Sequence, residues 1–172
     1  MNNTKKVTLR ALEPEDLELI YKIENDTTIW DVGSSKVNYS RYAIKQYIAQ
    51  QPQEISVAGE LRLVITNSET GEAVGLIDLT NYSATNRSAE VGIALLASER
   101  GKGYGKAAIK EIERYAKEFH NLRMLYAHTS ASNLSVAKNL FLTCNYKPVA
   151  TLPEWHFNGR EYEDLTVFKK NV

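Results

Sequence analysis

The amino-acid sequence predicts a mixed, mostly antiparallel α/β fold in which helices flank one twisted sheet. Two observations lead to this prediction. The first half of the chain places a strand and two amphipathic segments before a hairpin of alternating apolar and polar residues. The second half runs strand, helix, strand, helix and then a final pair of strands. With 172 residues and no repeat or linker, the chain is expected to form a single domain over residues 1–172.

Periodicity predicts two helices and three strands in the first half of the chain. Pro14 lies near the first turn of the first helix, where proline is tolerated, and Ser40 precedes the second helix. A turn at residues 68–71 separates the two strands of the hairpin. In chain order, the expected segments are a strand at 6–10, a helix after Pro14, a loop at 25–38, a helix ending at Pro52, and strands at 61–66 and 73–79.

The second half is expected to begin with a loop at residues 81–87 and a strand at 88–96. A long helix follows this strand. Its predicted core-facing stripe consists of Ala108, Ile112, Tyr115, Ala116 and Phe119. The remaining expected segments are a strand at 123–128, a helix at 133–143, and strands at 146–151 and 161–168.

The segment 100–106, which joins that strand to the long helix, is the most informative part of the sequence. It reads Arg-Gly-Lys-Gly-Tyr-Gly-Lys. A glycine-rich turn at the start of a helix leaves main-chain N–H groups unpaired, with the positive end of the helix dipole behind them. Glycine also lets a ligand approach the backbone closely. We therefore expect a phosphate-bearing ligand here.

Two common phosphate-binding loops do not fit this segment. A P-loop requires glycine where Arg100 stands and Ser or Thr where Ala107 stands. A dinucleotide-binding fingerprint requires its third glycine at the position of Lys106. These differences disfavour an enzyme of nucleotide phosphates. The pattern that remains is Arg/Gln-x-x-Gly-x-Gly, formed by Arg100, Gly103 and Gly105.

This pattern resembles the GNAT superfamily of N-acetyltransferases, whose most characteristic motif holds the pyrophosphate of acetyl-CoA. Residues 9–17 resemble the family's opening strand and first helix, and residues 133–142 resemble the helix that contacts the pantetheine arm. Residues 155–162 are similar to the closing hairpin of the spermidine and ribosomal-protein N-terminal acetyltransferase branches. The resemblance covers nearly the whole chain and implies the GNAT fold, in which CoA lies between splayed central strands.

The resemblance also implies which residues contact acetyl-CoA, the co-substrate. Main-chain groups of the strand before the turn would hold the pantetheine and polarise the thioester carbonyl, and the turn would hold the pyrophosphate. At Asn133, cofactor contact and helix capping are both open. The expected cofactor-binding residues are Ile93, Ala94, Leu95, Arg100, Gly101, Lys102, Gly103, Tyr104, Gly105, Lys106 and Asn133.

Acetyl transfer to an amine requires a proton acceptor, because a lysine-like amine has a pKa of about 10.4 and is protonated at neutral pH. Glu90 is the expected base, since several GNAT enzymes hold a base-like glutamate at this place on the strand. Its alternative roles are pairing with Arg87 or facing water. Asp78, on the neighbouring strand, is the second candidate.

The sequence departs from its relatives at Phe141, where many of these enzymes have a tyrosine that protonates the CoA thiolate. Tyr146 is the candidate replacement, with a position in the core as the alternative. A thiol has a pKa of about 8.5, so its thiolate can leave without a general acid. We therefore expect direct acetyl transfer to a primary amine of a polyamine, a protein N-terminus or a small molecule. The alternative is a catalytically weak CoA-binding or regulatory protein.

Acidic residues after the first helix, Glu24, Asp26 and Asp31, occupy a region where spermidine acetyltransferases carry acids, although solvated loop acids are equally expected. Trp30 and Trp155 are candidates for the wall of a substrate groove.

Bulk composition gives no electrostatic reason to expect nucleic acid or a membrane as a partner, because Lys plus Arg and Asp plus Glu number 21 each. The single cysteine, Cys144, fits a reducing compartment and is expected to be buried. The three histidines lack metal-ligand spacing, so no metal is expected. We expect a soluble cytoplasmic protein, and a homo-oligomer is left open.

Overall fold

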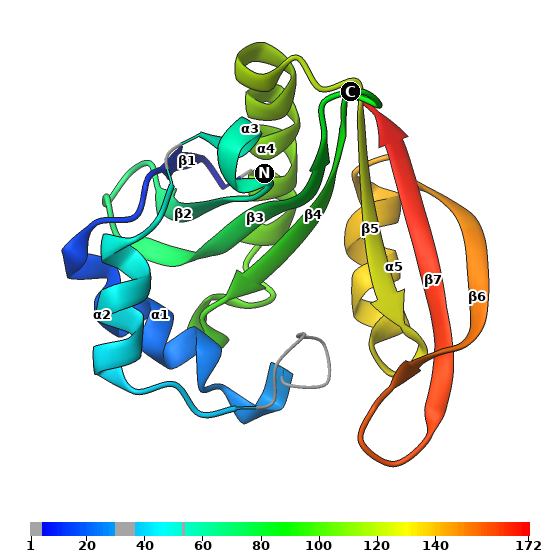
Figure 1. Ribbon diagram of the computed structural model, residues 1–172, viewed down its shortest axis with the longest axis horizontal. Coiled ribbons are helices and arrows are strands. Elements are labelled where there is room, and N and C mark those ends of the chain that lie inside the picture. Colours follow the sequence, from blue (N-terminus) through cyan, green and yellow to red (C-terminus); the bar gives the residue numbers. More distant parts are fainter. Residues whose placement is uncertain (1–4, 30–36, 53) are drawn as a thin grey trace.

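The computed structural model describes residues 5–29, 37–52 and 54–172 (Figure 1). Seven strands form one sheet in the order β1-β2-β3-β4-β5-β7-β6. All neighbouring strands are antiparallel except β4 and β5, which run parallel. This sheet confirms the predicted fold class. The strands are β1 Val7–Arg10, β2 Leu61–Asn67, β3 Ala73–Ser83, β4 Ser88–Leu95, β5 Met124–Ser130, β6 Lys147–Phe157 and β7 Tyr162–Asn171.

Helices cover both faces of the sheet, so two hydrophobic clusters form. Helices α1 and α2 pack on one face through a cluster that includes Ile20, Ile44 and Val64, and α4 and α5 pack on the other face (Figure 1). Within the described residues, no helix is long and apolar enough to cross a bilayer. The helices are α1 Leu17–Glu24, α2 Arg41–Ala49, α3 Ile55–Ala58, α4 Tyr104–His120 and α5 Leu134–Thr143.

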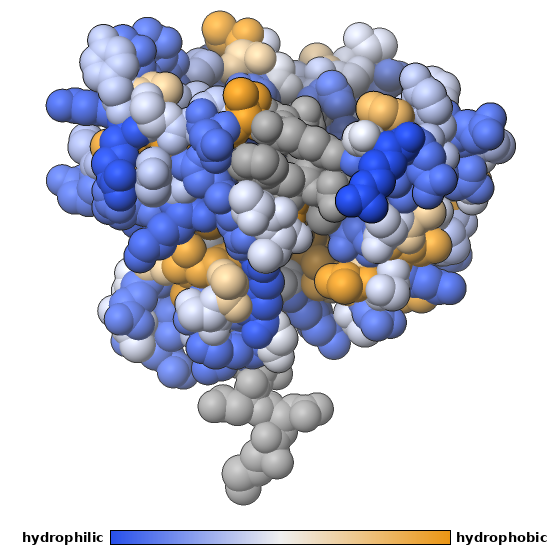
Figure 2. Space-filling view, turned by 90° about the horizontal axis from the view of Figure 1, so that it is seen from below, coloured by the Kyte–Doolittle hydropathy of each residue, from blue (hydrophilic) through white to orange (hydrophobic). Residues whose placement is uncertain are grey.

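The two halves of the sheet meet at β4 and β5, which pair over only three positions. These pairs run from Ser88 opposite Met124 to Glu90 opposite Tyr126. Beyond Glu90 the two strands diverge and leave a gap that widens toward the end of β4 (Figure 1). The predicted splayed central strands are therefore present. Figure 2 views the molecule from this open end, where apolar side chains lie among a mostly hydrophilic surface.

Several predicted element boundaries were wrong. β3 continues to Ser83 through a bulge, so part of the predicted loop at 81–87 belongs to a strand. β6 is longer than predicted and contains a bulge between Leu152 and His156. The short helix α3 was not predicted, and it ends at Gly59, which has φ +75°.

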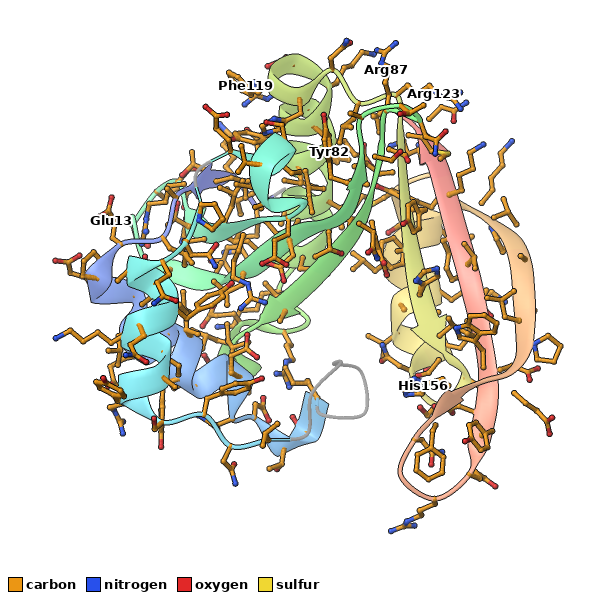
Figure 3. All side chains as sticks on the ribbon, in the orientation of Figure 1. Glu13, Tyr82, Arg87, Phe119, Arg123 and His156 are labelled. Carbon is orange, nitrogen blue, oxygen red and sulfur yellow. The ribbon has the colours of Figure 1, made fainter. Side chains whose placement is uncertain are left out.

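Phe119, predicted to face the core, is 64% exposed. It lies in the last turn of α4 and points away from the sheet (Figure 3). The rest of the stripe is correct, because Ala108, Ile112 and Ala116 are fully buried and Tyr115 is partly buried against the same cluster. Cys144 is also buried, as predicted. Helical periodicity gives the direction of a side chain but does not indicate where the sheet beneath the helix ends.

The start of α1 is held by a partly buried ion pair. Asp16 is 4% exposed, and its carboxylate accepts two hydrogen bonds from the Arg10 guanidinium, each 2.7 Å long. The main-chain N–H of Glu13 donates a third, at 2.8 Å. Burial by itself would raise the pKa of Asp16, but the hydrogen bonds from Arg10 and Glu13 outweigh it and lower the pKa. This carboxylate therefore links β1 to the α1 segment.

We predict that Asp16→Ala lowers the free energy of unfolding by about 2 kcal/mol at pH 7, because Arg10 and the Glu13 N–H lose their acceptor. The pKa of Asp16 is lower in the folded state than in the unfolded state. Its stabilisation is thus complete at neutral pH and is lost as the pH falls below about 4. Denaturant unfolding followed by circular dichroism at pH 7 measures the loss of unfolding free energy, and the same experiment at lower pH measures how the loss declines. Glu15→Ala, at the exposed neighbouring residue, is the control and should change little.

Candidate functional site

The glycine turn lies at the wide end of the gap. A 3-10 turn at Ala97–Glu99 follows β4, and α4 begins at Tyr104. Gly101 and Gly103 have φ of +76° and +92°, in the left-handed region that favours glycine. No side chain caps α4, and no described residue accepts a hydrogen bond from the main-chain N–H groups of residues 101–106. The turn therefore presents a cluster of free donors at the positive end of a 17-residue helix.

The charged side chains of the turn, Arg100 and Lys102, are paired with acidic residues of the protein. The Arg100 guanidinium is directed at Asp26, with Nη2 2.6 Å from Oδ2, and it also donates to Thr28 Oγ1 at 3.1 Å and Leu95 O at 3.1 Å. Its charge is thus balanced within the protein. Lys102 is half exposed and lies 3.2 Å from Glu99. The predicted anion site therefore depends mainly on main-chain N–H groups.

Tyr104 offers only its main chain to a ligand at the turn. Its side chain is 4% exposed, and its hydroxyl accepts a hydrogen bond of 3.1 Å from Asn67 Nδ2. Gly105 lies where α4 passes α5, since a Cβ built there would be 3.4 Å from the side chain of Leu140. The two helices that border the gap thus lie close together here, and a Cβ would be in ordinary van der Waals contact with α5.

Strand β4 offers alternate main-chain groups to the gap. The N–H of Leu96 donates to Val74 O, on the β3 side. Because main-chain groups alternate in direction along a strand, Ala94 also faces β3, whereas Ile93 and Leu95 face the gap. Of the three residues predicted to contact the pantetheine through their main chains, Ile93 and Leu95 are thus directed at the gap, and Leu95 offers only its N–H because its carbonyl accepts from Arg100. All three residues have register partners on β3, but only the main-chain groups of Ala94 point toward its partner there, Leu76.

Asn133 lies at the N-cap of α5, on the β5 side of the gap. Its side chain makes no capping hydrogen bond, so the amide is not committed to the helix. Phe141 is 5% exposed and packs against Phe168, with ring centroids 5.7 Å apart. This position therefore contributes to the core.

Tyr146 is 1% exposed and packs beside Phe141, with ring centroids 5.2 Å apart. Its hydroxyl is buried and has no hydrogen-bond partner among the described residues. Burial, and then the nearby Glu113 charge, raise the pKa of the Tyr146 phenol. This environment supports the core alternative considered for Tyr146, and we assign it no catalytic role.

Glu90 lies at the last pair before β4 and β5 diverge. Its Oε2 accepts a hydrogen bond of 2.8 Å from Asn81 Nδ2, and its Oε1 lies 2.8 Å from His128 Nδ1. The expected alternative partner, Arg87, instead donates to Asn121. Glu90 thus sits at the closed end of the gap among groups that hold its carboxylate.

Asp78, the second candidate base, is engaged in an ion pair. Both of its oxygens accept hydrogen bonds of 2.8 Å from Arg62, and Arg62 Nη1 donates to Glu24 at 2.6 Å. Burial opposes the charge on Arg62, yet the Asp78 carboxylate raises the pKa of the guanidinium overall. Asp78 is therefore poorly suited to accept a proton from substrate.

Sequence reasoning missed His128 and Asn81. Both lie on strands next to β4, and both contact the Glu90 carboxylate. The signal for His128 was its position two residues beyond Tyr126 on β5, which alternation places on the same face of the sheet. That signal is usable only once the register between β4 and β5 is known.

Of the acids predicted near the acceptor, Glu24 and Asp26 lie within the described residues. Asp26 lines a pocket between α1 and the segment that follows β4, together with Lys22, Ile23 and residues 96–98. Asp31 and Trp30 lie outside the described residues. Trp155 is 67% exposed on β6. No group of three or more potential metal-ligating side chains gathers in the described part of the chain.

Comparison with known proteins gives consistent matches. Residues 6–140 match the family described as Acetyltransferase (GNAT) domain. The spermidine N(1)-acetyltransferase of Vibrio cholerae is 26% identical over 160 residues, covering 93% of this chain and 90% of that protein. The enzyme of the same name from Escherichia coli K12 is 26% identical over 133 residues, covering 77% and 69%.

A solved structure shares the same fold over almost the full length. The crystal structure of spermidine N-acetyltransferase from Vibrio cholerae in complex with CoA and spermine superposes with a TM-score of 0.84 at 25% identity, covering 96% of this chain and 95% of that chain. The family match covers residues 6–140. The free donors at the glycine turn and the gap between β4 and β5 are consistent with this match. The chain belongs to the GNAT acetyltransferase family and is an acetyl-CoA-dependent N-acetyltransferase.

Proposed function

We propose that this enzyme transfers the acetyl group of acetyl-CoA to a primary amine of a polyamine. The observation that carries the proposal is the cluster of free N–H groups at residues 101–106, next to a gap that closes at Glu90. The acceptor class is supported by the acids near the gap and by the similarity to enzymes named for spermidine.

The cofactor would lie along β4 in the gap. The N–H groups of residues 101–106 would bind the diphosphate, as expected for an anion at a helix N-terminus. The main chains of Ile93 and Leu95 would pair with the pantetheine amides, and Asn133 would contact the arm from the β5 side. An N–H of β4 would then donate to the thioester oxygen as negative charge develops on it.

The reaction would proceed by direct attack of the neutral amine on the thioester. The ammonium of a polyamine must first lose a proton, which the cluster of Glu90, Asn81 and His128 would accept. The C–N bond forms, the C–S bond breaks, and CoA leaves as a thiolate. Because that thiolate is stable near neutral pH, the reaction does not require the hydroxyl of Tyr146.

The acceptor would approach from the open end of the gap, on the side of α1. Asp26 remains ionised there, because hydrogen bonds from Thr28 and then Arg100 lower its pKa. Glu24 lies nearby on α1 and is bonded to Arg62. A polyamine carries positive charges spaced along an apolar chain, and the pocket offers it the apolar side chains of Ile23 and Leu96. Asp26 is paired with Arg100 and Lys22 also lines the pocket, so a substrate ammonium would share the Asp26 carboxylate with the guanidinium.

We predict that Gly103→Asp weakens CoA binding by at least about tenfold, because the new carboxylate would repel the diphosphate. Gly71→Asp is the matched control. Gly71, in the β2–β3 turn, also has positive φ, +75°, and a Cβ there meets no atom within 4 Å. Both variants therefore carry similar backbone strain, and only Gly103→Asp should lose affinity in isothermal titration. Equal affinities for the two variants would contradict the assigned cofactor site.

We predict that spermidine and spermine are acetylated with a kcat/KM at least about tenfold above that of N-terminal peptides, aminoglycosides or free amino acids, because several ammonium groups meet the acids. Release of the CoA thiol, followed with a thiol reagent, measures the rates. Preference for another amine class would refute the polyamine acceptor alone. Tight CoA binding without thiol release for any amine would favour the non-catalytic alternative.

A further inference from the structure

We infer that His128 Nε2 is the group that accepts the proton from the amine, and that Glu90 and Asn81 are positioning residues for it. This inference rests on the proposed N-acetyltransferase function. It assigns separate roles to the three polar residues at the closed end of the gap, Glu90, Asn81 and His128. It differs from the expectation that Glu90 itself is the base.

The contacts of Glu90 account for both of its oxygens. Oε1 lies 2.8 Å from His128 Nδ1, and Oε2 accepts from Asn81 Nδ2 at 2.8 Å. A carboxylate beside one imidazole nitrogen favours the tautomer with the proton on that nitrogen. The other nitrogen, Nε2, is then an acceptor with a free lone pair. The same carboxylate would stabilise the imidazolium that forms when the proton arrives.

Exposure and position also favour His128 over Glu90 as the group that meets substrate. The His128 side chain is 34% exposed, whereas that of Glu90 is 20% exposed. Glu90 pairs with Tyr126, the last residue of β5 in register with β4. His128 lies two residues further along, on the same face, where the strands have separated. Its imidazole therefore borders the gap, while Glu90 lies deeper at its closed end.

Asn81 is held for this contact by an unusual backbone conformation. It lies in the β3 bulge between Thr80 and Ser83 and has φ +50°. Residues other than glycine rarely adopt such a φ, and asparagine tolerates it better than most. Bulges often redirect a side chain next to a functional site. Here the Asn81 amide, which lies in the bulge, donates to Oε2 of Glu90. The other carboxylate oxygen, Oε1, is then left for His128.

The proton balance of the step is complete. The substrate ammonium gives one proton to His128 Nε2, and its free lone pair forms the C–N bond to the thioester carbon. As the C–S bond breaks, the second proton lost by the nitrogen neutralises the CoA thiolate. His128 then returns its proton to solvent. The products are the N-acetylated amine, the CoA thiol and one released proton.

Kinetics of four variants test these roles. His128→Ala should lower kcat/KM by about a hundredfold or more, with CoA affinity unchanged, and added imidazole should restore part of the rate. Asn81→Gly keeps the positive φ and removes the amide, so a loss of about tenfold is expected. Glu90→Gln should lower the rate without rescue by imidazole. His120→Asn, in the last turn of α4, should retain full activity. His128→Ala with more than a third of the wild-type kcat/KM would overturn the assignment.

A spectroscopic measurement separates this inference from the proposed function. Nitrogen-15 NMR of the histidine rings in the wild-type protein should show His128 with its proton on Nδ1, and Glu90→Gln should shift that proton toward Nε2. A wild-type protein with the Nε2–H tautomer would refute the inference even if spermidine is acetylated. Absence of turnover with the Nδ1–H tautomer present would instead count against the proposed function.

Discussion

The structure depends on the limited pairing between β4 and β5. Three residue pairs join the two halves of the sheet, and beyond Glu90 the strands separate. Beyond Glu90 the main-chain groups of β4 and β5 that face the gap do not pair with each other, so they are open to water or a ligand. The pantetheine of CoA carries amides that can supply such bonds. The cofactor would thus act as a short extra strand, and the place where the gap closes fixes where the thioester can lie.

Ion pairs fix the remaining parts of the site around this gap. Arg62 bonds both Glu24 and Asp78, and so links α1 to β2 and β3. Arg100 bonds Asp26 and Thr28, and so links the segment after α1 to the glycine turn. Acids that the sequence suggested for the acceptor therefore also hold the fold together. Replacing them would disturb both acceptor binding and the geometry of the turn.

Residue types specify the glycine turn well, since alternate glycines before an amphipathic helix require positive φ and leave donors free. That part of the site could be predicted locally. The gap between the central strands was expected only from resemblance to a family, and the strand order was not predicted, because periodicity contains no register. The Arg100 contact with Asp26 spans 74 residues, and the Glu90 contact with Asn81 depends on a bulge. Neither could be predicted from spacing, so the partner of the Arg100 side chain and the partners of Glu90 were missed.

The arrangement also explains how the chain can dispense with a tyrosine at Phe141. Parallel strands β4 and β5 are each followed by a helix, which brings the N-termini of α4 and α5 to the same end of the gap (Figure 1). Both positive dipole ends then face the space expected for the coenzyme. Negative charge on the diphosphate is favoured there, and the CoA thiolate needs little further help because its proton affinity is modest. The demanding step is removal of a proton from the ammonium, and the polar groups of this site are accordingly concentrated where the strands meet.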